Sequence, residues 1–386
     1  MPEPPPILAK DVPRQFEAIP PKVRSSKWFG STKRYLGANN GVGEHRRIPF
    51  PEYTTAGANW FGKGEHFQGI ARIGRHLFIS GGVTGASARS QIVVIEMGSQ
   101  LSEGPWALPE YGYSYKEPSI QDHIVGWIDV DRDKWHAGGI QAADGIVAIP
   151  VYYPGTGVSE VRFLDFRDPA LLDIAGAADW SRVAPERYDI PDTALHKDGG
   201  FEAKAVGITW VPQESKWLLA VWDDQQLHFH FSAGPDIRQG GFEFAKLEHK
   251  LRVGEHLFKG FLPHDESIPG TYQSLNLVTE ESGDIYLIAG RNSSGWAPTV
   301  GGTDKLDLYR VTWPLGFQQR PRLAAILTKD FIEPCSKQMY CYNQQCSFAT
   351  GCGIYIDDPE HMVLYGASHW LHGGNSRYNF NEYSYS

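Results

Sequence analysis

The sequence predicts an all-β protein, because three of its features are typical of a ring of similar antiparallel sheets. A weak repeat of about 70 residues occurs five times along the chain. Each copy holds short segments that are apolar or that alternate apolar with polar residues, as strands do. The 386 residues include 42 glycines and 26 prolines, which suits a fold with many turns. These observations predict a five-bladed β-propeller of four-stranded antiparallel blades.

The first segment of each repeat has a polar residue in first place, glycine or asparagine in fourth place and isoleucine or leucine in fifth place. The five segments are residues 66–70, 136–140, 204–208, 273–277 and 350–354. Their starts are separated by 70, 68, 69 and 77 residues. Glycine allows a neighbouring backbone to approach closely. We therefore expect these segments to be the inner strands that line a central channel, with the fifth residues forming an apolar ring.

Two more strands follow each inner strand after a short turn. The second strands are apolar throughout and lie at residues 76–80, 146–149, 217–222, 285–288 and 362–365. The third strands alternate and lie at residues 91–95, 161–166, 227–231, 306–311 and 378–383. Less regular fourth strands are predicted around residues 124–130, 182–190, 242–253 and 323–331. Two stacked β-sandwiches are the structural alternative.

The fifth repeat ends after its third strand, so its outer strand should come from the N-terminal region. Residues 46–53 are the predicted location of that strand, which would close the ring and cover its edges. We accordingly predict a proline-rich, basic arm in residues 1–45 and a single propeller domain in residues 46–386. The arm has no apolar core of a classical secretory signal, which slightly favours a cytoplasmic location.

Composition and charge argue against two classes of partner. Lys and Arg number 36 against 45 Asp and Glu, a net charge of −9 that disfavours a general nucleic-acid binder. No apolar run approaches the length of about 18 residues that a membrane span needs. We make no prediction of the oligomeric state.

The repeat register predicts that the first residues of the inner strands gather at one mouth of the channel. Imidazole titrates near neutrality and can donate or accept a proton. We therefore predict His66 and His136 as a proton-transfer pair and Lys204 as the group that stabilises developing negative charge. Nearby carboxylates could orient the histidines: Glu65, Asp133 and Glu202. The alternative is that these side chains only bind one another and channel water.

Further polar and aromatic residues on the same face are candidates for substrate binding. Gln273, Thr350 and Gln68 belong to inner strands, and Arg291, His369 and Trp370 belong to the loops after second strands. The blade-two loop that begins at Tyr152 adds aromatic residues. Exposed aromatic rings beside Arg, Asn and His suit sugars or aromatic metabolites.

Metal ligation is an open alternative. The sequence requires no cofactor and holds no HExxH or EF-hand motif. A divalent metal, if used, would be held by His66, His136 and His369. His228 and His230 alternate onto one face of a third strand, which favours a satisfied or solvent-facing role over ligation.

Four cysteines lie within 18 residues: Cys335, Cys341, Cys346 and Cys352. They allow three disulfide pairings, and the sequence does not choose among them. Reduced thiols, disulfides and a metal or catalytic role all stay open. Cys352 is the strongest functional candidate of the four because its strand is expected to line the channel.

The repeat over residues 46–386 resembles the β-propeller superfamily. Its five-bladed members include arabinanase-like glycosidases and tachylectin-like sugar binders. The glycosidases imply carboxylates on the inner strands as acid and base, but the matching positions here are His66, His136, Lys204, Gln273 and Thr350. That mechanism is therefore not carried over. The lectins imply near-identical sites in every blade, whereas these blades differ, which favours one asymmetric site.

The sequence as a whole favours an enzyme that acts on one small polar or anionic organic substrate at the channel mouth. Histidine-mediated proton transfer suits a lyase, an isomerase, a cyclase or a hydrolase. The alternative is a non-catalytic propeller that binds a glycan or metabolite, or a scaffold for protein partners.

Overall fold

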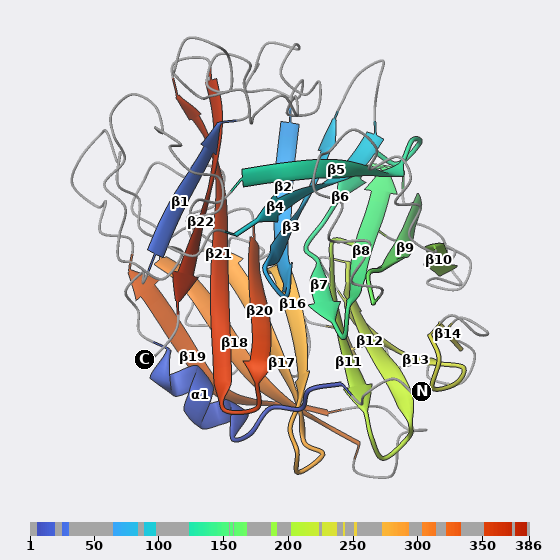
Figure 1. The fold of residues 1–386 in the computed structure, drawn as a ribbon. Coiled ribbons are helices and arrows are strands. Elements are labelled where there is room, and N and C mark those ends of the chain that lie inside the picture. The colour runs from blue at the N-terminus through green and yellow to red at the C-terminus, as the bar shows by residue number, and fades with distance from the viewer. Residues whose placement is uncertain are drawn as a thin grey trace.

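The computed structural model describes the greater part of the predicted sheets. The described residues are 6–19, 25–30, 65–83, 89–97, 123–153, 155–156, 158–167, 187–190, 202–223, 226–237, 242–243, 251–252, 272–292, 303–313, 322–332, 351–372 and 375–383. They form five antiparallel sheets, which we call blades one to five in chain order (Figure 1).

Each blade begins at the axis and continues outward. Blade one consists of β2 (Glu65–Ile73), β3 (His76–Val83), β4 (Arg89–Glu96) and β5 (His123–Asp131). Blade two consists of β6 (His136–Ala137), β7 (Gln141–Ala143), β8 (Ile146–Tyr153), β9 (Val158–Asp165) and β10 (Arg187–Ile190). Blade three consists of β11 (Ala205–Val211), β12 (Lys216–Trp222), β13 (Gln226–Ser232), β14 (Phe242–Glu243) and β15 (Leu251–Arg252).

Blades four and five complete the ring. Blade four consists of β16 (Tyr272–Thr279), β17 (Ile285–Asn292), β18 (Thr303–Thr312) and β19 (Arg322–Ile332). Blade five consists of β20 (Gly351–Asp358), β21 (His361–His372), β22 (Asn375–Tyr383) and β1 (Ser25–Gly30). The inner strands touch in the cyclic order β2, β7, β11, β16, β20 and back to β2. The predicted five-bladed propeller is confirmed.

The ring is closed by an N-terminal strand, as predicted, but from a different segment. β1 pairs antiparallel with β22 along six residues, from Ser25 opposite Glu382 to Gly30 opposite Arg377. The strand therefore lies upstream of residues 46–53, which are outside the described residues. The division of the chain at residue 46 stays a prediction, although β1 shows that the arm contributes to a blade.

The residues before β1 clip blades four and five together. Ala9 N donates to Thr279 O at 3.0 Å, and Lys10 N donates to Pro359 O at 2.7 Å. Helix α1 (Val12–Ala18) then packs Phe16 into an apolar cluster that blades four and five share. No helix in the described parts of the chain is long and apolar enough to cross a membrane.

Apolar side chains from neighbouring blades form the core. The two faces of a strand pack against different blades because side chains alternate. On β12, Leu219 packs with Phe163 of blade two, whereas Leu218 packs with Leu287 of blade four. The fifth-place residues of the inner strands are all buried, as predicted: Ile70, Ile140, Ile208, Leu277 and Ile354.

Neighbouring inner strands approach closely where the repeat has glycine. A Cβ atom on Gly353 would lie 2.0 Å from Ile70 O of blade one, and one on Gly69 would lie 2.5 Å from Ile140 N of blade two. Such distances are impossible for a real side chain. The fourth-place glycine is therefore needed for blade contact, as its place in the repeat predicted.

Polar side chains complete the hydrogen bonding between inner strands. Ser274 Oγ of blade four accepts from Cys352 N of blade five at 2.6 Å, and Asn276 Oδ1 accepts from Ile354 N at 3.0 Å. Gln141 reaches across the axis: its Oε1 accepts from Ile208 N at 2.7 Å and Leu277 N at 2.8 Å. Its Nε2 donates to Leu277 O at 2.8 Å. This side chain joins blades two, three and four.

His228 and His230 lie inside the protein, which excludes a solvent-facing role. Their exposed fractions are 4% and 2%. They stand opposite Val221 and Leu219, whose side chains pack toward blade two. His228 Nε2 lies 3.3 Å from Asp223 Oδ2. Burial lowers the pKa of His230 well below its usual value, and the neighbouring His228 lowers it further.

We predict that Gln141→Ala lowers the free energy of unfolding by about 3–5 kcal/mol, because it strands three buried backbone groups. The matched control is Gln213→Ala at an exposed turn, where we expect a change within about 0.5 kcal/mol. Urea unfolding measures both. Equal stability of the two variants would contradict the bridging role of Gln141.

We also predict that stability falls as the pH drops below about 6.5, because the unfolded chain then binds a proton that folded His230 excludes. One such proton contributes a slope of about 1.4 kcal/mol per pH unit within that window. His230→Gln should remove this slope, whereas His361→Gln, at the partly exposed first residue of β21, should keep it. Urea unfolding between pH 7.5 and 5.5 compares them, and an unchanged slope in His230→Gln would rule out this cause.

Candidate functional site

The candidate site begins with a contact between two side chains of blade two, one on β6 and one on β8. His136 on β6 stands opposite Tyr152 on β8. His136 Nε2 and the Tyr152 hydroxyl are 3.2 Å apart, and the ring centroids are 4.2 Å apart. The rings are 6% and 3% exposed, and Trp135 packs edge-on against His136. Burial on both sides fixes the orientation of the imidazole.

Lys204 and Glu202 extend this contact into blade three. Lys204 Nζ lies 3.5 Å from Glu202 Oε2 and 5.5 Å from the centroid of the Tyr152 ring. Glu202 Oε1 also accepts a hydrogen bond from Gly155 N in the hairpin between β8 and β9. The side chains of Lys204 and Glu202 are 29% and 20% exposed, so solvent reaches both. Glu202 therefore holds Lys204 and the hairpin, and not the histidines that its place in the sequence suggested.

Gln68 and Gln273 form the floor beside these residues. Gln68 Nε2 of blade one donates to Gln273 Oε1 of blade four at 3.2 Å, although these blades are not neighbours in the ring. A Cβ atom on Gly139 would lie 2.2 Å from Gln273 O, and one on Gly351 would lie 2.1 Å from Gln68 O. The backbones thus close the channel at this level. Gln68 is 8% exposed, and its Oε1 has no hydrogen-bond partner among the described residues.

The backbones of His66 and His136 lie near each other because both are next to Gly82. His66 pairs with Gly82 on β3, and a Cβ atom on Gly82 would lie 1.7 Å from Trp135 O. The side chain of His66 and all of Thr350 are outside the described residues. The proposed histidine pair therefore stays a prediction that the backbone positions allow.

The other predicted binding residues are placed by their backbones alone. Arg291 on β17 pairs with Tyr272, which precedes Gln273. His369 and Trp370 belong to β21 rather than to a loop, and pair with Tyr378 and Arg377. Their side chains are outside the described residues, so their roles stay predictions. Within the described parts of the chain, no three His, Cys, Asp or Glu residues are grouped to hold a metal ion, and the proposed His66, His136 and His369 set is untested.

Cys352 lies in the core rather than in the channel. Its side chain is fully buried in the apolar cluster between blades four and five, and the thiol is close to Gly290. The prediction that the Cys352 thiol faces the channel is therefore wrong. Side chains alternate along β20, and that of Cys352 points to the core. The other three cysteines are outside the described residues.

An ionic network supports the loop that leads to His136. Asp131 Oδ1 accepts from the backbone N–H groups of Asp133 and Lys134, both at 2.8 Å, and Asp131 Oδ2 lies 2.6 Å from Arg162 Nη2. Burial alone raises the pKa of Asp131, but the N–H of Lys134 and the Arg162 guanidinium together hold that pKa below its usual value. The carboxylate thus stays charged and fixes the loop between β5 and β6. Asp133 contributes its backbone to this turn.

Sequence reasoning missed the role of Tyr152. It placed Tyr152 at the start of a loop, whereas β8 continues through Tyr153. The pairing could have been found from the sequence. In an antiparallel hairpin, the first residue of the inner strand, here His136, stands opposite a residue near the end of the second strand.

Comparisons with known proteins assign neither a family nor an activity to this chain. No family model matches the sequence, and no curated protein matches it. Solved structures that resemble it include the catalytic domain of a GH62 alpha-L-arabinofuranosidase from Coprinopsis cinerea, with 10% identity, a TM-score of 0.45 and coverage of 95% of this chain and 99% of that one. The GH43 endo-arabinanase from Bacillus licheniformis has 13% identity, a TM-score of 0.41 and coverage of 84% and 96%.

A third structure, titled as GH43B of the Bacteroides ovatus xyloglucan PUL, has 9% identity and a TM-score of 0.40. The match covers 84% of this chain and 53% of that one, so the chain spans about half the length of that protein. TM-scores below 0.5 at such identities assign no activity. The sheets themselves define the class of protein, which is a five-bladed β-propeller, and no particular family within it is identified by sequence.

We predict that Tyr152→Phe costs about 0.5–1.5 kcal/mol of unfolding free energy, because it removes the hydroxyl that contacts buried His136. The ring beneath Lys204 remains. Tyr153→Phe is the matched control, because Tyr153 is 46% exposed. Urea unfolding gives the stability, and the ¹⁵N shifts of the His136 ring should change only in Tyr152→Phe. Identical His136 spectra in both variants would show that the hydroxyl contact is not formed.

Proposed function

We propose that this protein is an enzyme that acts on one small polar or anionic organic substrate where the inner strands begin. The proposal depends on one observation, the continuous series of contacts from Glu202 through Lys204 and Tyr152 to His136. The series brings a carboxylate, an ammonium, a phenol and an imidazole together. Such a combination supplies both a proton-transfer group and a charge-stabilising group.

His136 is the proposed proton-transfer residue. Its Nε2 atom shares a hydrogen bond with the Tyr152 hydroxyl at 3.2 Å. An imidazole can take a proton from a substrate and return it near neutral pH. Tyr152 orients the ring through this hydrogen bond. His66, whose backbone is near that of His136, is the proposed second member of the pair.

Lys204 is the proposed stabiliser of negative charge. Its ammonium lies above the face of Tyr152 and beside Glu202, which limits its motion. Its side chain is part exposed, so an anionic group of a substrate can reach it. A fixed cation beside a proton-transfer group stabilises the charge that develops in the transition state.

Gln68 and Gln273 are the proposed positioning residues. The amide pair forms the floor of the site, and Gln68 Oε1 offers an acceptor for a substrate hydroxyl or N–H. Thr350, Arg291, His369 and Trp370 are proposed to complete the walls. A divalent ion, if bound, would be held by His66, His136 and His369.

The proposed chemistry needs no organic cofactor. Proton transfer by His136 with charge stabilisation by Lys204 suits a lyase, an isomerase, a cyclase or a hydrolase. A glycan or a hydroxylated acid would satisfy both the floor amides and the ammonium.

The test begins with a panel of sugar acids, hydroxy acids and aryl glycosides, each followed by ¹H NMR with the full-length protein. For a compound that is converted, His136→Gln should lower kcat by about 10²–10⁴-fold, because it removes the proton-transfer group. His361→Gln, at the partly exposed first residue of β21 and outside the site, is the matched control and should keep full turnover.

Full turnover in His136→Gln would overturn the assignment of the proton-transfer residue. Saturable binding of a panel compound without conversion, retained in His136→Gln, would favour the non-catalytic binding module instead.

A further inference from the structure

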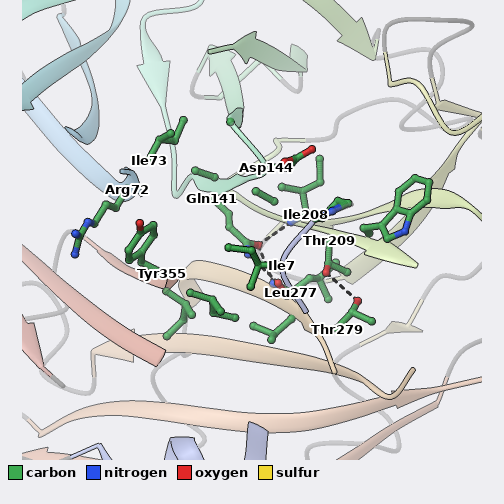
Figure 2. Close-up of a pocket in the computed structure, with 18 of the residues that line it drawn as sticks. Ile7, Arg72, Ile73, Gln141, Asp144, Ile208, Thr209, Leu277, Thr279 and Tyr355 are labelled. Atoms are coloured by element: carbon green, nitrogen blue, oxygen red, sulfur yellow. Dashed lines mark hydrogen bonds between the residues drawn. The ribbon is translucent and has the colours of Figure 1, made fainter. Parts of the chain in front are cut away.

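A cavity lies at the other end of the axis, where the inner strands end (Figure 2). Its volume is about 200 Å³. All five blades line it, through Ile73, Ala143, Trp210, Thr279 and Ile356. Residues 6–8 of the N-terminal segment provide a sixth wall.

The cavity is separate from the proposed active site. Gln141 lies at its inner end, and all three hydrogen bonds of that side chain are made to the backbones of Ile208 and Leu277. Gln68 and Gln273 close the channel nearer the other end. A molecule in this cavity therefore has no direct route to His136.

The walls of the cavity combine apolar and polar surface in about equal parts, and the apolar part lies deepest. Ile208, Leu277 and Ile354 of the buried inner ring form its deep surface. Ile7, labelled in Figure 2, also lines the cavity, although the residue is 52% exposed. The segment that carries Ile7 is anchored directly afterward by the bonds of Ala9 to blade four.

One pair of hydroxyl groups lies among these walls. Thr209 Oγ1 and Thr279 Oγ1 are 2.8 Å apart, and the two residues are 7% and 2% exposed (Figure 2). Two hydroxyls carry two protons, but their mutual bond uses only one. One O–H donor and several lone pairs are left for a ligand in the cavity.

The charged groups that line the cavity do not favour a charged ligand. Arg72 donates through Nε to Gly74 O and through Nη1 to the Tyr365 hydroxyl, both at 2.6 Å. Its guanidinium also lies 4.1 Å from the centroid of the Tyr355 ring. Asp144 carries the opposite charge on another wall. The cavity thus has one positive and one negative group and no excess of either sign. A ligand without net charge therefore fits best.

The geometry points to a binding site for an uncharged single-ring compound that carries a hydroxyl group. The site is the cavity where the inner strands end. A cavity of about 150 Å³ suffices for benzene in other proteins. The cavity here is larger, so it has room for a ring and a hydroxyl. The ring contacts Ile208, Leu277 and Ile7, and its hydroxyl bonds to the Thr209–Thr279 pair.

Phenol and benzene are the probes that test this site. The variant is the double substitution Thr209→Val with Thr279→Val, which removes both hydroxyls while keeping their shape, so neither partner is left unsatisfied. Saturation-transfer NMR should show phenol bound to the wild-type protein with a Kd of about 1 mM. The double variant should bind phenol about three- to tenfold more weakly, the loss expected for one hydrogen bond, and bind benzene unchanged.

Two further variants identify the location. Ser282→Ala, at an exposed turn, is the control and should bind phenol as the wild type does. Ile7→Trp enlarges a part-exposed wall residue, and should abolish binding of both probes by filling the cavity. Thermal melts confirm that each variant is folded. Absence of phenol binding at 10-fold the expected Kd, equal phenol affinity in the double valine variant, or unchanged binding in Ile7→Trp would each overturn the proposal.

Discussion

The fold depends on how five inner strands satisfy their backbone hydrogen bonds around an axis. Each inner strand has a sheet partner on its outer side only, so its other edge faces neighbouring blades. The structure meets this need with direct backbone bonds, such as Gly139 N to Lys204 O, and with side-chain acceptors, such as Ser274 and Asn276. Buried backbone groups without partners would otherwise cost about 1–3 kcal/mol each.

This solution requires small residues beside polar ones. Fourth-place glycines let the blades approach, and the polar side chains then reach the adjacent backbone. The same arrangement fills the channel with protein. Gln141 and the Gln68–Gln273 pair close it at two levels, so the two ends offer different environments. One end presents the contacts of His136, Tyr152 and Lys204, and the other presents an aliphatic surface with a hydroxyl pair and one charge of each sign.

Much of this architecture could be predicted because it is encoded by local patterns. The glycine in fourth place and the aliphatic residue in fifth place follow from contacts that every blade repeats. The second and third strands follow from alternation and apolar runs. The position of β1 could not be predicted in this way, because Ser25–Gly30 is neither strongly apolar nor strictly alternating, and its identity as a strand depends on pairing with β22.

The site was less predictable than the fold, because its contacts join residues from different strands. His136 and Lys204 could be placed at strand starts by counting, but their link through Tyr152 depends on side-chain directions. Glu202 contacts the Lys204 ammonium and the N–H of Gly155, and the spacing of residues in the repeat predicts neither contact. Cys352 illustrates the same limit, since an inner strand has one face toward the axis and another toward the core.

The pairing of β1 with β22 has a consequence for biosynthesis. The two strands are about 350 residues apart in the chain, so β1 leaves the ribosome long before its partner exists. Contacts of such long separation form slowly, and until then the newly made β1 presents an open edge that can pair with the wrong chain. Assembly of the last blade is therefore the step at which chaperones would have most to protect.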